Sequence, residues 1–568
     1  MRPHRDSSPC AWHRLRGLAL LSLLGSTFPV WAASPRLPPL EVPEERAAPA
    51  VPGFVLPPVD AGDALPADGA QLFVKAVAFR GNTVFADKLL QDIATPYLGR
   101  TLNAVEIEEL RRKLTLLYVN AGYVNSGALL ETAAKFDGTL HFTIIEGTVS
   151  QVRLRGLERL DEGYVAHRLV PEPSAPLNIE NLRERYQLLL SDPLFTGINT
   201  RLVPDVTQGK AILDVEVVRA TPYQLTVAAN NYRAPAIGEY ATNVTGLVRN
   251  LTGFGDALTL NWESSINGSA SSRYGLNWTL PINYQGTLLT VLADKGSSSV
   301  IEEPLGPLMI ESQASNKEIG LTHPFIQTLS QNLTLGIAWS DRTNKTSLLG
   351  IPFSFTPGIP DGVLKVSTVK LSQNFTYRTE SNVFVQRLTY NDARDNLLEP
   401  APGSSANSQP PSRYSFWVAQ FYFGQRITEG GTQFQARATV QEASTRLTAL
   451  DGFSIGGANT VRGYRENQLL RDKGAIVNLE LNVPLLSSKA AGAVQLNVVP
   501  FLDWGIGHNI GDSSTKLSSV GLAVRASWYG LTMELAVAKR LQHPRSIDAL
   551  SGTLQDKGIH FQLSYSAF

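Results

Sequence analysis

The spacing of hydrophobic and polar positions changes near residue 220. Residues 71–220 mix short alternating stretches with stretches in which apolar side chains recur every three or four positions. From residue 221 to residue 568 only alternation recurs, interrupted by clusters of Gly, Asn, Asp, Ser and Pro. A repeat of two is typical of a half-exposed strand, and a repeat of 3.6 is typical of an amphipathic helix. The pattern therefore predicts an α+β region followed by an all-β region.

The first α+β segment, residues 71–147, predicts one small module. Residues 73–79 alternate as a strand does, and the turn pair Gly81 and Asn82 ends that stretch. Two helices follow, and the second begins where Asn103 precedes a glutamate by three positions, which is the pairing of a capping box. A pair of strands closes the module, so the predicted order is β-α-α-β-β.

Residues 148–220 repeat this order at about the same length. A strand, two helices and two further strands are predicted there, with little sequence identity to the first module. A recurring order of elements at a fixed period indicates an internal repeat. We therefore interpret 71–147 and 148–220 as two modules of one kind, and two unrelated domains are the alternative.

The region 221–568 predicts a membrane barrel. Its clearest alternating stretches are Leu258–Trp262, Tyr274–Leu280, Leu333–Trp339, Val477–Val483 and Leu531–Val537. A soluble sandwich alternates in the same way, but the long run of strands and the aromatic residues near their ends favour a barrel. Linkers near 300–316, 341–363 and 391–413 have the polar composition of external loops. The length suits 16 antiparallel strands at about 22 residues each, including connections.

The N-terminus predicts export. Residues 1–32 place basic side chains before an apolar run and end on a Val-x-Ala cleavage signal, as a signal peptide does; an uncleaved anchor is the alternative. Residues 33–70 are a Pro-rich linker, in which we expect neither a packed helix nor a strand. The one cysteine, Cys10, precedes the apolar run. The mature chain is thus predicted to have no disulfide, no thiolate metal site and no cysteine nucleophile.

Composition and motifs argue against several classes of protein. The chain has 50 basic and 50 acidic residues, whereas a nucleic-acid-binding protein shows a basic surplus. Residues 452–456 match the G-x-S-x-G motif of hydrolases, but a Gly-rich loop follows where that motif requires a helix. No nucleotide-binding loop and no dense carboxylate–histidine cluster is present in the sequence. We expect no enzyme activity, no cofactor and no metal.

Two segments of the all-β region carry the candidate functional residues. The first is the loop segment Val461-Arg462-Gly463-Tyr464, which is too polar to face lipid, and the second is the strand segment Phe501-Leu502-Asp503-Trp504-Gly505. Alternation places Phe501, Asp503 and Gly505 on the lumen side of that strand. A carboxylate there favours a cationic partner, and a guanidinium is the best planar donor for it. A solvated Asp503 and an unrelated Arg462 are the alternative.

These segments together resemble two-partner secretion transporters, the outer-membrane barrels that export haemolysins and filamentous adhesins. Residues 453–464 resemble the family's sixth extracellular loop, and 501–505 resemble its F-x-D-x-G strand motif, whose Asp pairs with the loop Arg. Gly81-Asn82, with Glu146-Gly147 at the end of the first module, is similar to polypeptide-transport-associated (POTRA) domains. The C-terminal Phe568 resembles a barrel-assembly signal, although Phe561, Leu563 and Tyr565 are one residue out of step with it.

The resemblance implies a non-catalytic pore in the outer membrane with both modules in the periplasm. Its partners would be a large secreted protein that crosses the lumen unfolded, the outer-membrane lipid and the barrel-assembly machinery, with no nucleic acid involved. A barrel-assembly insertase of the same superfamily is the alternative. A passive solute porin is disfavoured because such a pore needs no periplasmic modules.

Overall fold

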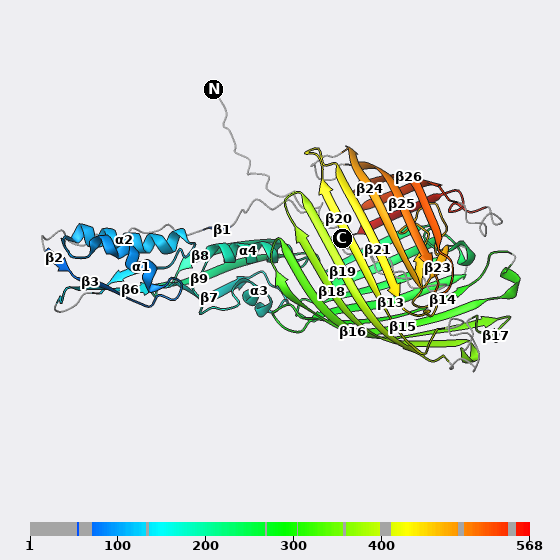
Figure 1. Cartoon of the computed structure of the whole chain (residues 1–568), viewed down its shortest axis with the longest axis horizontal. Helices are drawn as coiled ribbons and strands as arrows, with labels where there is room; N and C mark the ends of the chain where they lie inside the picture. Colours follow the sequence, from blue (N-terminus) through cyan, green and yellow to red (C-terminus); the bar gives the residue numbers. More distant parts are fainter. Residues whose placement is uncertain are drawn as a thin grey trace, which may run out of the picture. The chain divides into compact units, whose positions relative to one another are not determined.

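A computed structural model gives the structure of the chain, whose elements are labelled in Figure 1. The structure describes residues 54–55, 71–131, 136–266, 270–303, 305–355, 359–397, 410–486, 494–542 and 552–567. The predicted signal peptide, all of the linker except two residues, and Phe568 lie outside the described residues. Among the described helices, none combines the length and the apolar character needed to cross a membrane.

The described residues form two compact units, one before residue 221 and one after it. Residues up to 220, together with 253–255, belong to the first unit, and 221–252 with the residues after 255 belong to the second. The change in sequence pattern near residue 220 coincides with this division.

The first module follows the predicted order. Its elements are β2 (Leu72–Val74), β3 (Ala76–Arg80), α1 (Asp87–Ala94), the 3-10 helix η1 (Thr95–Tyr97), β4 (Arg100–Leu102), α2 (Ala104–Asn120), β5 (Gly127–Leu130) and β6 (Thr139–Ile145). The main sheet has the order β3-β6-β5. The capping box is present, since the Asn103 side chain accepts from the N–H of Glu106 and the Glu106 side chain accepts from that of Asn103. Buried Leu110, Leu114 and Tyr118 of α2 pack in the module's core with Phe142 of β6.

The single strand predicted over 73–79 is two strands. β2 pairs with β4, whereas β3 pairs in parallel with β6. The chain changes sheets at Lys75, whose N–H donates to the carbonyl of Gly138. Alternation of side chains continues across such a break, which is why the sequence does not show it.

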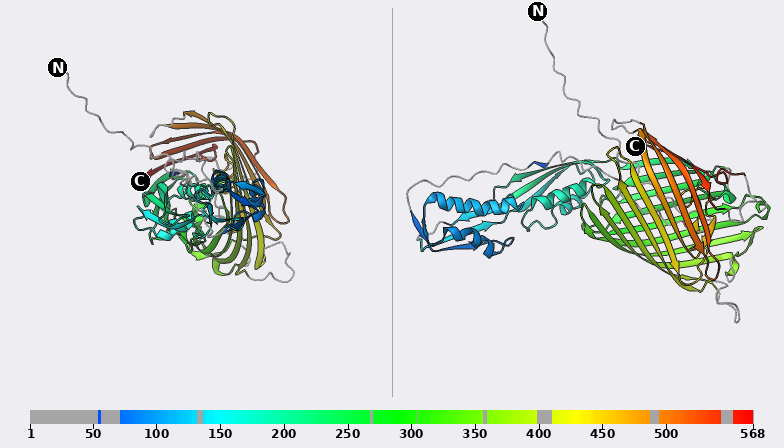
Figure 2. Two further views of the ribbon diagram at one scale, coloured as in Figure 1. Left: turned by 90° about the vertical axis from the view of Figure 1, so that its left-hand side faces the viewer. Right: turned by 45° about the horizontal axis from the view of Figure 1, so that its top comes forward.

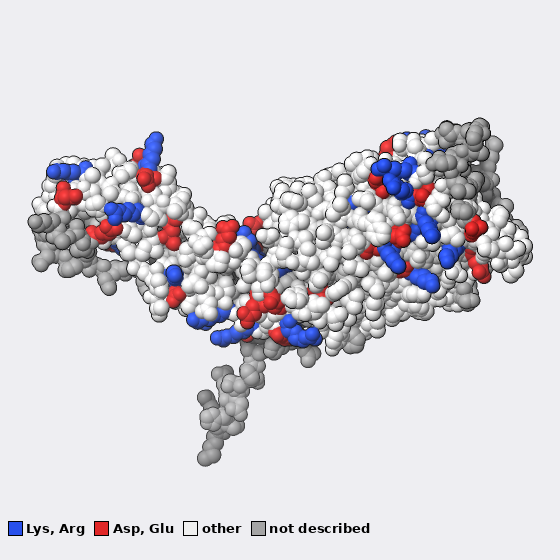
Figure 3. Space-filling view, turned by 90° about the horizontal axis from the view of Figure 1, so that it is seen from below, with Lys and Arg blue, Asp and Glu red and all other residues white. Residues whose placement is uncertain are grey.

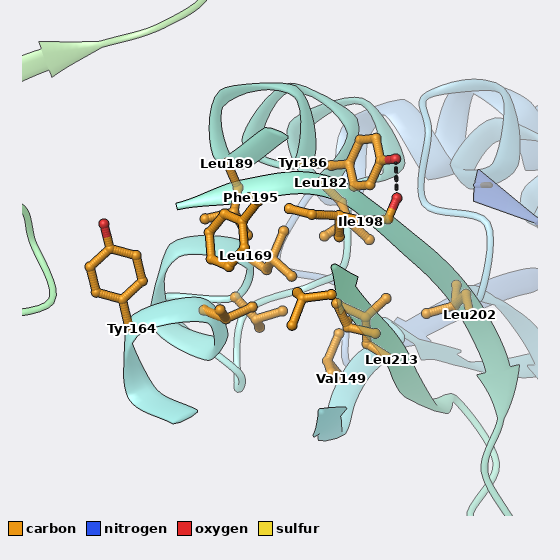
Figure 4. Packing of buried hydrophobic residues seen from close by; sticks show 14 of the residues in the cluster. Val149, Tyr164, Leu169, Leu182, Tyr186, Leu189, Phe195, Ile198, Leu202 and Leu213 are labelled. Atoms are coloured by element: carbon orange, nitrogen blue, oxygen red, sulfur yellow. Dashed lines mark hydrogen bonds between the residues drawn. The ribbon is translucent and has the colours of Figure 1, made fainter. Parts of the chain in front are cut away.

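The second module repeats the arrangement with a core of its own. Its elements are β7 (Thr148–Arg155), α3 (Glu162–Leu169), α4 (Ile179–Leu190), β8 (Phe195–Pro204) and β9 (Lys210–Arg219). Leu182 and Tyr186 of α4 pack with Leu213 of β9 (Figure 4). The hydroxyl of Tyr186 donates to the carbonyl of Ile198 at 2.7 Å, so this buried polar group is satisfied.

One strand lies in the linker, where we expected none. β1 (Phe54–Val55) pairs in parallel with Thr200 and Arg201 of β8, so the sheet order is β1-β8-β9-β7. The expectation was wrong because a two-residue strand needs backbone N–H groups only at its own positions. The flanking prolines, Pro52 and Pro57, do not remove those groups.

The second unit is a closed antiparallel barrel of 16 wall strands, which confirms the prediction (Figures 1 and 2). The wall strands are β10 (Tyr223–Asn230), β11 (Ala241–Arg249), β12 (Ala257–Ser265), β13 (Ser271–Pro281), β14 (Leu288–Ser299), β15 (Glu311–Gln327), β16 (Gln331–Leu348), β18 (Val363–Arg378), β19 (Asn382–Asp395), β20 (Arg413–Arg426), β21 (Gln433–Ala443), β24 (Lys473–Leu486), β25 (Gln495–His508), β26 (Thr515–Trp528), β27 (Leu531–Arg540) and β28 (Ile559–Ala567). The short β17 (Ile351–Pro352) pairs with the end of β16. β10 pairs with β28 and closes the barrel.

Alternation along the wall strands separates an apolar outside from a polar inside. Leu260 and Trp262 of β12 are exposed on the outer side, as are Ile337 and Trp339 of β16. Figure 3 shows one face on which a broad part of the barrel wall carries no charged residue, while charged side chains gather toward one end. An apolar outer band is the requirement for a barrel in lipid.

The connections at the two ends of the barrel differ in length. Those at the end where the chain enters from residue 220 are short, such as residues 328–330, 379–381 and 529–530. The opposite end carries longer ones, including 300–310, 349–362 and 444–472. Parts of the predicted loops 300–316, 341–363 and 391–413 are strand instead, because β15 and β16 extend for 17 and 18 residues and β19 continues to Asp395. The polar composition of these segments is the reason that the sequence predicted loops.

Candidate functional site

The longest fully described connection, residues 444–472 between β21 and β24, is folded against the inner wall of the barrel; we call it the lumen loop. Two short strands inside it, β22 (Phe453–Ile455) and β23 (Leu469–Arg471), pair with each other. They hold residues 456–468 between them, and Val461, Arg462 and Tyr464 of this tip are buried. Buried Phe453, Ile455 and Val461 pack with Ile476 and Leu517 of the wall, which anchors the loop by apolar contact.

Arg462 makes a two-pronged contact with Asp503. Its Nε lies 2.7 Å from Oδ2 of Asp503, its Nη2 lies 2.7 Å from Oδ1, and its backbone N–H donates to Oδ2 at 3.0 Å. Asp503 is 0% exposed and Arg462 is 3% exposed. The structure thus brings the two candidate residues together on the inner side of β25. Parallel charge-assisted hydrogen bonds of this kind are strong and directional.

Two further residues complete the surroundings of the Arg462 guanidinium. Nη1 of Arg462 lies 2.7 Å from Oε1 of Glu480, and the carbon at the centre of the guanidinium lies 3.5 Å above the middle of the Phe501 ring. The amide of Asn478 donates to Oδ1 of Asp503 at 2.8 Å. β24 and β25 bring these residues together because Asn478 pairs with Asp503 and Glu480 pairs with Phe501 in register. Each of the three guanidinium nitrogens therefore donates to a carboxylate, and one face of the group meets an aromatic ring.

Our reading of the sequence missed Glu480 and Asn478 as site residues. The signal for both was present, because alternation along residues 477–483 puts these polar positions on the lumen side. Alternation does not predict the register between β24 and β25, and this register determines which polar residues contact the loop. Arg525 of β26 extends the network, since it lies 3.1 Å from Glu480 and 3.0 Å from Glu534 of β27.

Glycine is required at two positions of the site by close approach. A Cβ on Gly505 would lie 2.6 Å from Cγ2 of Ile455 and 2.9 Å from Cγ2 of Val461, so a side chain there would push the loop off the wall. Gly463 has φ +90° and lies against Ala538 of β27. This left-handed conformation is one that glycine adopts without steric cost.

The remaining motif residue, Tyr464, fixes the loop to other strands. Its hydroxyl donates to the carbonyl of Gln542 at 2.7 Å, and the carbonyl of Ser518 lies 3.0 Å away. The N–H of Gly463 donates to Nε2 of His560 on β28 at 3.0 Å. All four residues of the segment 461–464 therefore contact the wall.

The turn at Gly81 and Asn82 joins a second cluster, in the first module. Gly81 has φ +82°, and a Cβ there would lie 2.5 Å from the carbonyl oxygen of Ile144. Next to this turn, the carboxylate of Glu146 accepts from the N–H groups of Thr83 and Val84 at 2.7 and 2.8 Å and from the hydroxyl of Tyr118 at 3.0 Å. Burial alone would raise the pKa of Glu146, but these hydrogen bonds outweigh burial and hold that pKa below its ordinary value.

The hydrolase-like motif at 452–456 does not form a nucleophile elbow. Ser454 lies in β22, and its hydroxyl donates to Oδ1 of Asn467 at 2.6 Å. Such an elbow places its serine on a sharp turn between a strand and a helix. Among the described residues, no group of three or more His, Cys, Asp or Glu could hold a metal ion.

Comparison with known proteins identifies the family. Residues 72–147 match the POTRA domain of the ShlB type, and residues 209–527, more than half of the chain, match the haemolysin secretion/activation proteins ShlB/FhaC/HecB. This chain belongs to that family. It is an outer-membrane transporter of the two-partner secretion type, and its POTRA region lies in the periplasm. The end of the barrel that receives the chain from residue 220 is thus the periplasmic end, and the lumen loop enters from the outside.

Relatives and solved structures agree with this assignment. The heme/hemopexin transporter protein HuxB of Haemophilus influenzae is 22% identical, with 82% of each chain covered. The outer membrane transporter CdiB of Dickeya dadantii is 20% identical, with 86% of each chain covered. The structure of CdiB from Escherichia coli superposes with a TM-score of 0.67 at 17% identity, covering 90% of this chain and 93% of that one. At this identity the last comparison shows the fold.

Proposed function

We propose that this chain captures one large secreted protein in the periplasm and passes it, unfolded, through the barrel lumen to the cell surface. The observation that carries the proposal is the lumen loop. A buried arginine–aspartate pair holds this loop against the wall of a barrel that a POTRA domain precedes in the chain. The fixed position of the loop suits a gate that must shift to admit a chain.

Capture is assigned to the first module. β5 is an edge strand, which pairs with β6 alone among the described residues. An extended segment of the partner can add its backbone to such an edge, or it can lie along the exposed side of α2. The periplasm supplies no nucleotide for active transport. Folding of the partner outside the cell therefore gives the direction, because a folded chain cannot return through the lumen.

Insertion of the transporter itself is assigned to the barrel-assembly machinery and the outer-membrane lipid. The apolar outer band of the barrel matches the hydrocarbon layer of a membrane. The C-terminal strand β28 exposes Leu563 and Tyr565 on the lipid side, and Phe568 follows as the proposed recognition signal. Loss of Phe568 is expected to lower the amount of barrel in the membrane without changing the export rate per barrel.

The test is export of the secreted partner by cells that carry this chain with and without residues 71–147. The deletion should abolish secretion while leaving a heat-modifiable barrel in the membrane, because the core of the first module is made of residues from that module alone. Normal secretion by the deletion variant would contradict capture by this module.

The same experiment addresses the insertase alternative, which the fold permits. BamA from Haemophilus ducreyi superposes with a TM-score of 0.50, covering 88% of this chain. A loss of several unrelated outer-membrane barrels when this chain is depleted would favour insertion. Loss of one secreted protein, with other barrels unchanged, is the result we expect.

A further inference from the structure

The barrel is closed by a short seam between its first and last wall strands. β10 and β28 are paired from Leu225↔Ala567 to Asn230↔Gln562, which is six register pairs. The neighbouring pairs β10–β11 and β27–β28 have eight and seven. Toward the outside of the cell, the N–H of Asn231 still donates to the carbonyl of Phe561 at 3.3 Å, and side chains continue the seam from there.

Asn231 supplies the first of these side-chain links. Its Nδ2 donates to the carbonyl of Ile559 at 2.9 Å, and its Oδ1 accepts from the N–H of Phe561 at 2.8 Å. Asn231 is fully buried. The amide group thus bonds to the backbone of β28 as one more residue of β10 would.

Gln555, in the connection between β27 and β28, links this seam to the lumen loop. Its Nε2 lies 2.6 Å from the carbonyl oxygen of Asn231 and 2.6 Å from that of Arg233, both just beyond β10. Its Oε1 accepts from the N–H of Glu466 in the lumen loop at 2.8 Å. Gln555 is 0% exposed. One buried amide therefore bonds on one side to the start of the barrel and on the other to the loop.

A second contact supports the same link from the loop side. Arg465 of the lumen loop makes a two-pronged contact with Asp556, with Nε–Oδ1 and Nη2–Oδ2 distances of 2.6 and 2.7 Å. Arg540 of β27 donates to the carbonyl oxygens of Gln555 and Asp556 at 3.2 and 3.0 Å. The backbone that carries Gln555 is thus held in place by the loop and by the wall.

We propose that docking of the lumen loop and closure of the β10–β28 seam are one coupled state, with Gln555 as the positioning residue that couples them. When the loop leaves the wall, Gln555 loses the N–H of Glu466, and its Nε2 is no longer held on the carbonyl groups beyond β10. Coupling of two sites is reciprocal, so a loosened seam also weakens docking of the loop. The inference rests on the lumen-loop site and not on the identity of the partner.

The test is the opening frequency of the purified full-length chain in planar bilayers, measured without any partner protein. Gln555→Met keeps the volume of the side chain and removes its amide, so the pore should open several-fold more often than the wild type. Gln562→Met is the matched control, because Gln562 also lies on β28 at this seam, opposite Asn230, but on the periplasmic side of the side-chain links. If Gln555→Met does not reach the membrane as a heat-modifiable barrel, Gln555→Asn replaces it.

A disulfide across the seam, which we call the seam staple, then distinguishes coupling between loop and seam from an effect on the loop alone. Ala228 and Ser564 are register partners across the seam, and the mature chain has no cysteine to interfere. Paired residues of this kind lie within disulfide range. In Gln555→Met, an oxidised Ala228→Cys/Ser564→Cys staple should return opening to the wild-type frequency, and reduction should restore the increase. Unchanged opening in Gln555→Met, or an increase that the staple does not reverse, would overturn the proposal.

Discussion

At the scale of the residue, Arg462 fits its site because of the shape of its side chain. Two carboxylates meet three of its nitrogens, and Phe501 covers one face of its planar group. A lysine carries the same charge but has a single nitrogen donor, so it cannot bond Asp503 and Glu480 together in this geometry. Removing one partner of a buried pair leaves an uncompensated charge, which costs about 3–5 kcal/mol.

Arg462 and Asp503 are expected to behave as one unit when each is replaced. Arg462→Ala and Asp503→Ala should each impair secretion and lower the heat stability of the barrel, and the double variant should lose less than the sum. A coupling of about 0.5–3 kcal/mol is typical of residues in contact. Arg462→Lys should restore only part of the function. All variants are compared at matched membrane levels, and strictly additive losses would show that the pair does not act together.

Glu146 in the first module makes stability depend on pH. Its pKa is lowered in the folded state, so the folded module binds this proton less tightly than the unfolded chain does. Its stabilising contribution is complete above the ordinary glutamate pKa of about 4.3, and it is lost as the pH falls through the lower, folded pKa. Glu146→Gln should lower the free energy of unfolding at neutral pH by roughly 1 kcal/mol, since solvent screens a partly exposed carboxylate.

Urea unfolding of residues 71–220 at several pH values measures this effect. The difference in free energy of unfolding between wild type and Glu146→Gln should shrink as the pH is lowered from 6 toward 3, because the wild type loses its carboxylate there. Glu180→Gln serves as the control, since Glu180 lies in the second module and bonds the side chain of Arg183 on an exposed surface. A difference that stays constant with pH would contradict the assignment.

At the scale of the element, the strand β1 occupies the outer edge of β8 in the second module. A sheet edge is a site to which an extended partner can add its own strand. The chain's own linker thus covers one of the edges that a secreted partner would otherwise find, while the edge at β5 in the first module stays available among the described residues.

Displacing β1 should therefore strengthen binding of the partner. Phe54→Pro/Val55→Pro removes the backbone N–H groups that a strand needs. We expect the unfolded partner to bind the full-length variant several-fold more tightly, as measured by surface plasmon resonance. The control Phe54→Ala/Val55→Ala keeps both N–H groups and should bind more weakly than the proline variant. Equal or weaker binding by the proline variant would show that β1 does not compete with the partner.

At the scale of the whole molecule, the repeated β-α-α-β-β order predicted the modules, and alternation over one long run of strands predicted the barrel, with its 16 strands estimated from length. Both are local patterns, and each is set by which side of an element is buried. The placement of Asp503 on the inner wall follows from the same alternation. The contact between Asp503 and Arg462 does not follow from alternation, because a loop of 29 residues can reach many positions. The prediction of that contact rested on the family resemblance.

The features that local patterns did not predict all depend on register or on distant strands. Glu480 and Asn478 meet the loop because of the β24–β25 register, and Gln555 meets it because the barrel closes. The strand β1 depends on the exposed edge of β8, which lies about 145 residues away in the sequence. No periodicity within one segment contains such information.

The central claim is that a secreted partner passes through the lumen of this barrel. The most direct measurement places a photoreactive residue at Thr389 or at Tyr390 on β19 while a partner with a folded C-terminal blocking domain is being exported. Thr389 pairs in register with buried Val418 on the lumen side, and Tyr390 packs against exposed Trp417 on the outer side. We predict that the partner is crosslinked from Thr389 and not from Tyr390. Export that continues without any crosslink from Thr389, or with equal crosslinking from both positions, would contradict passage through the lumen.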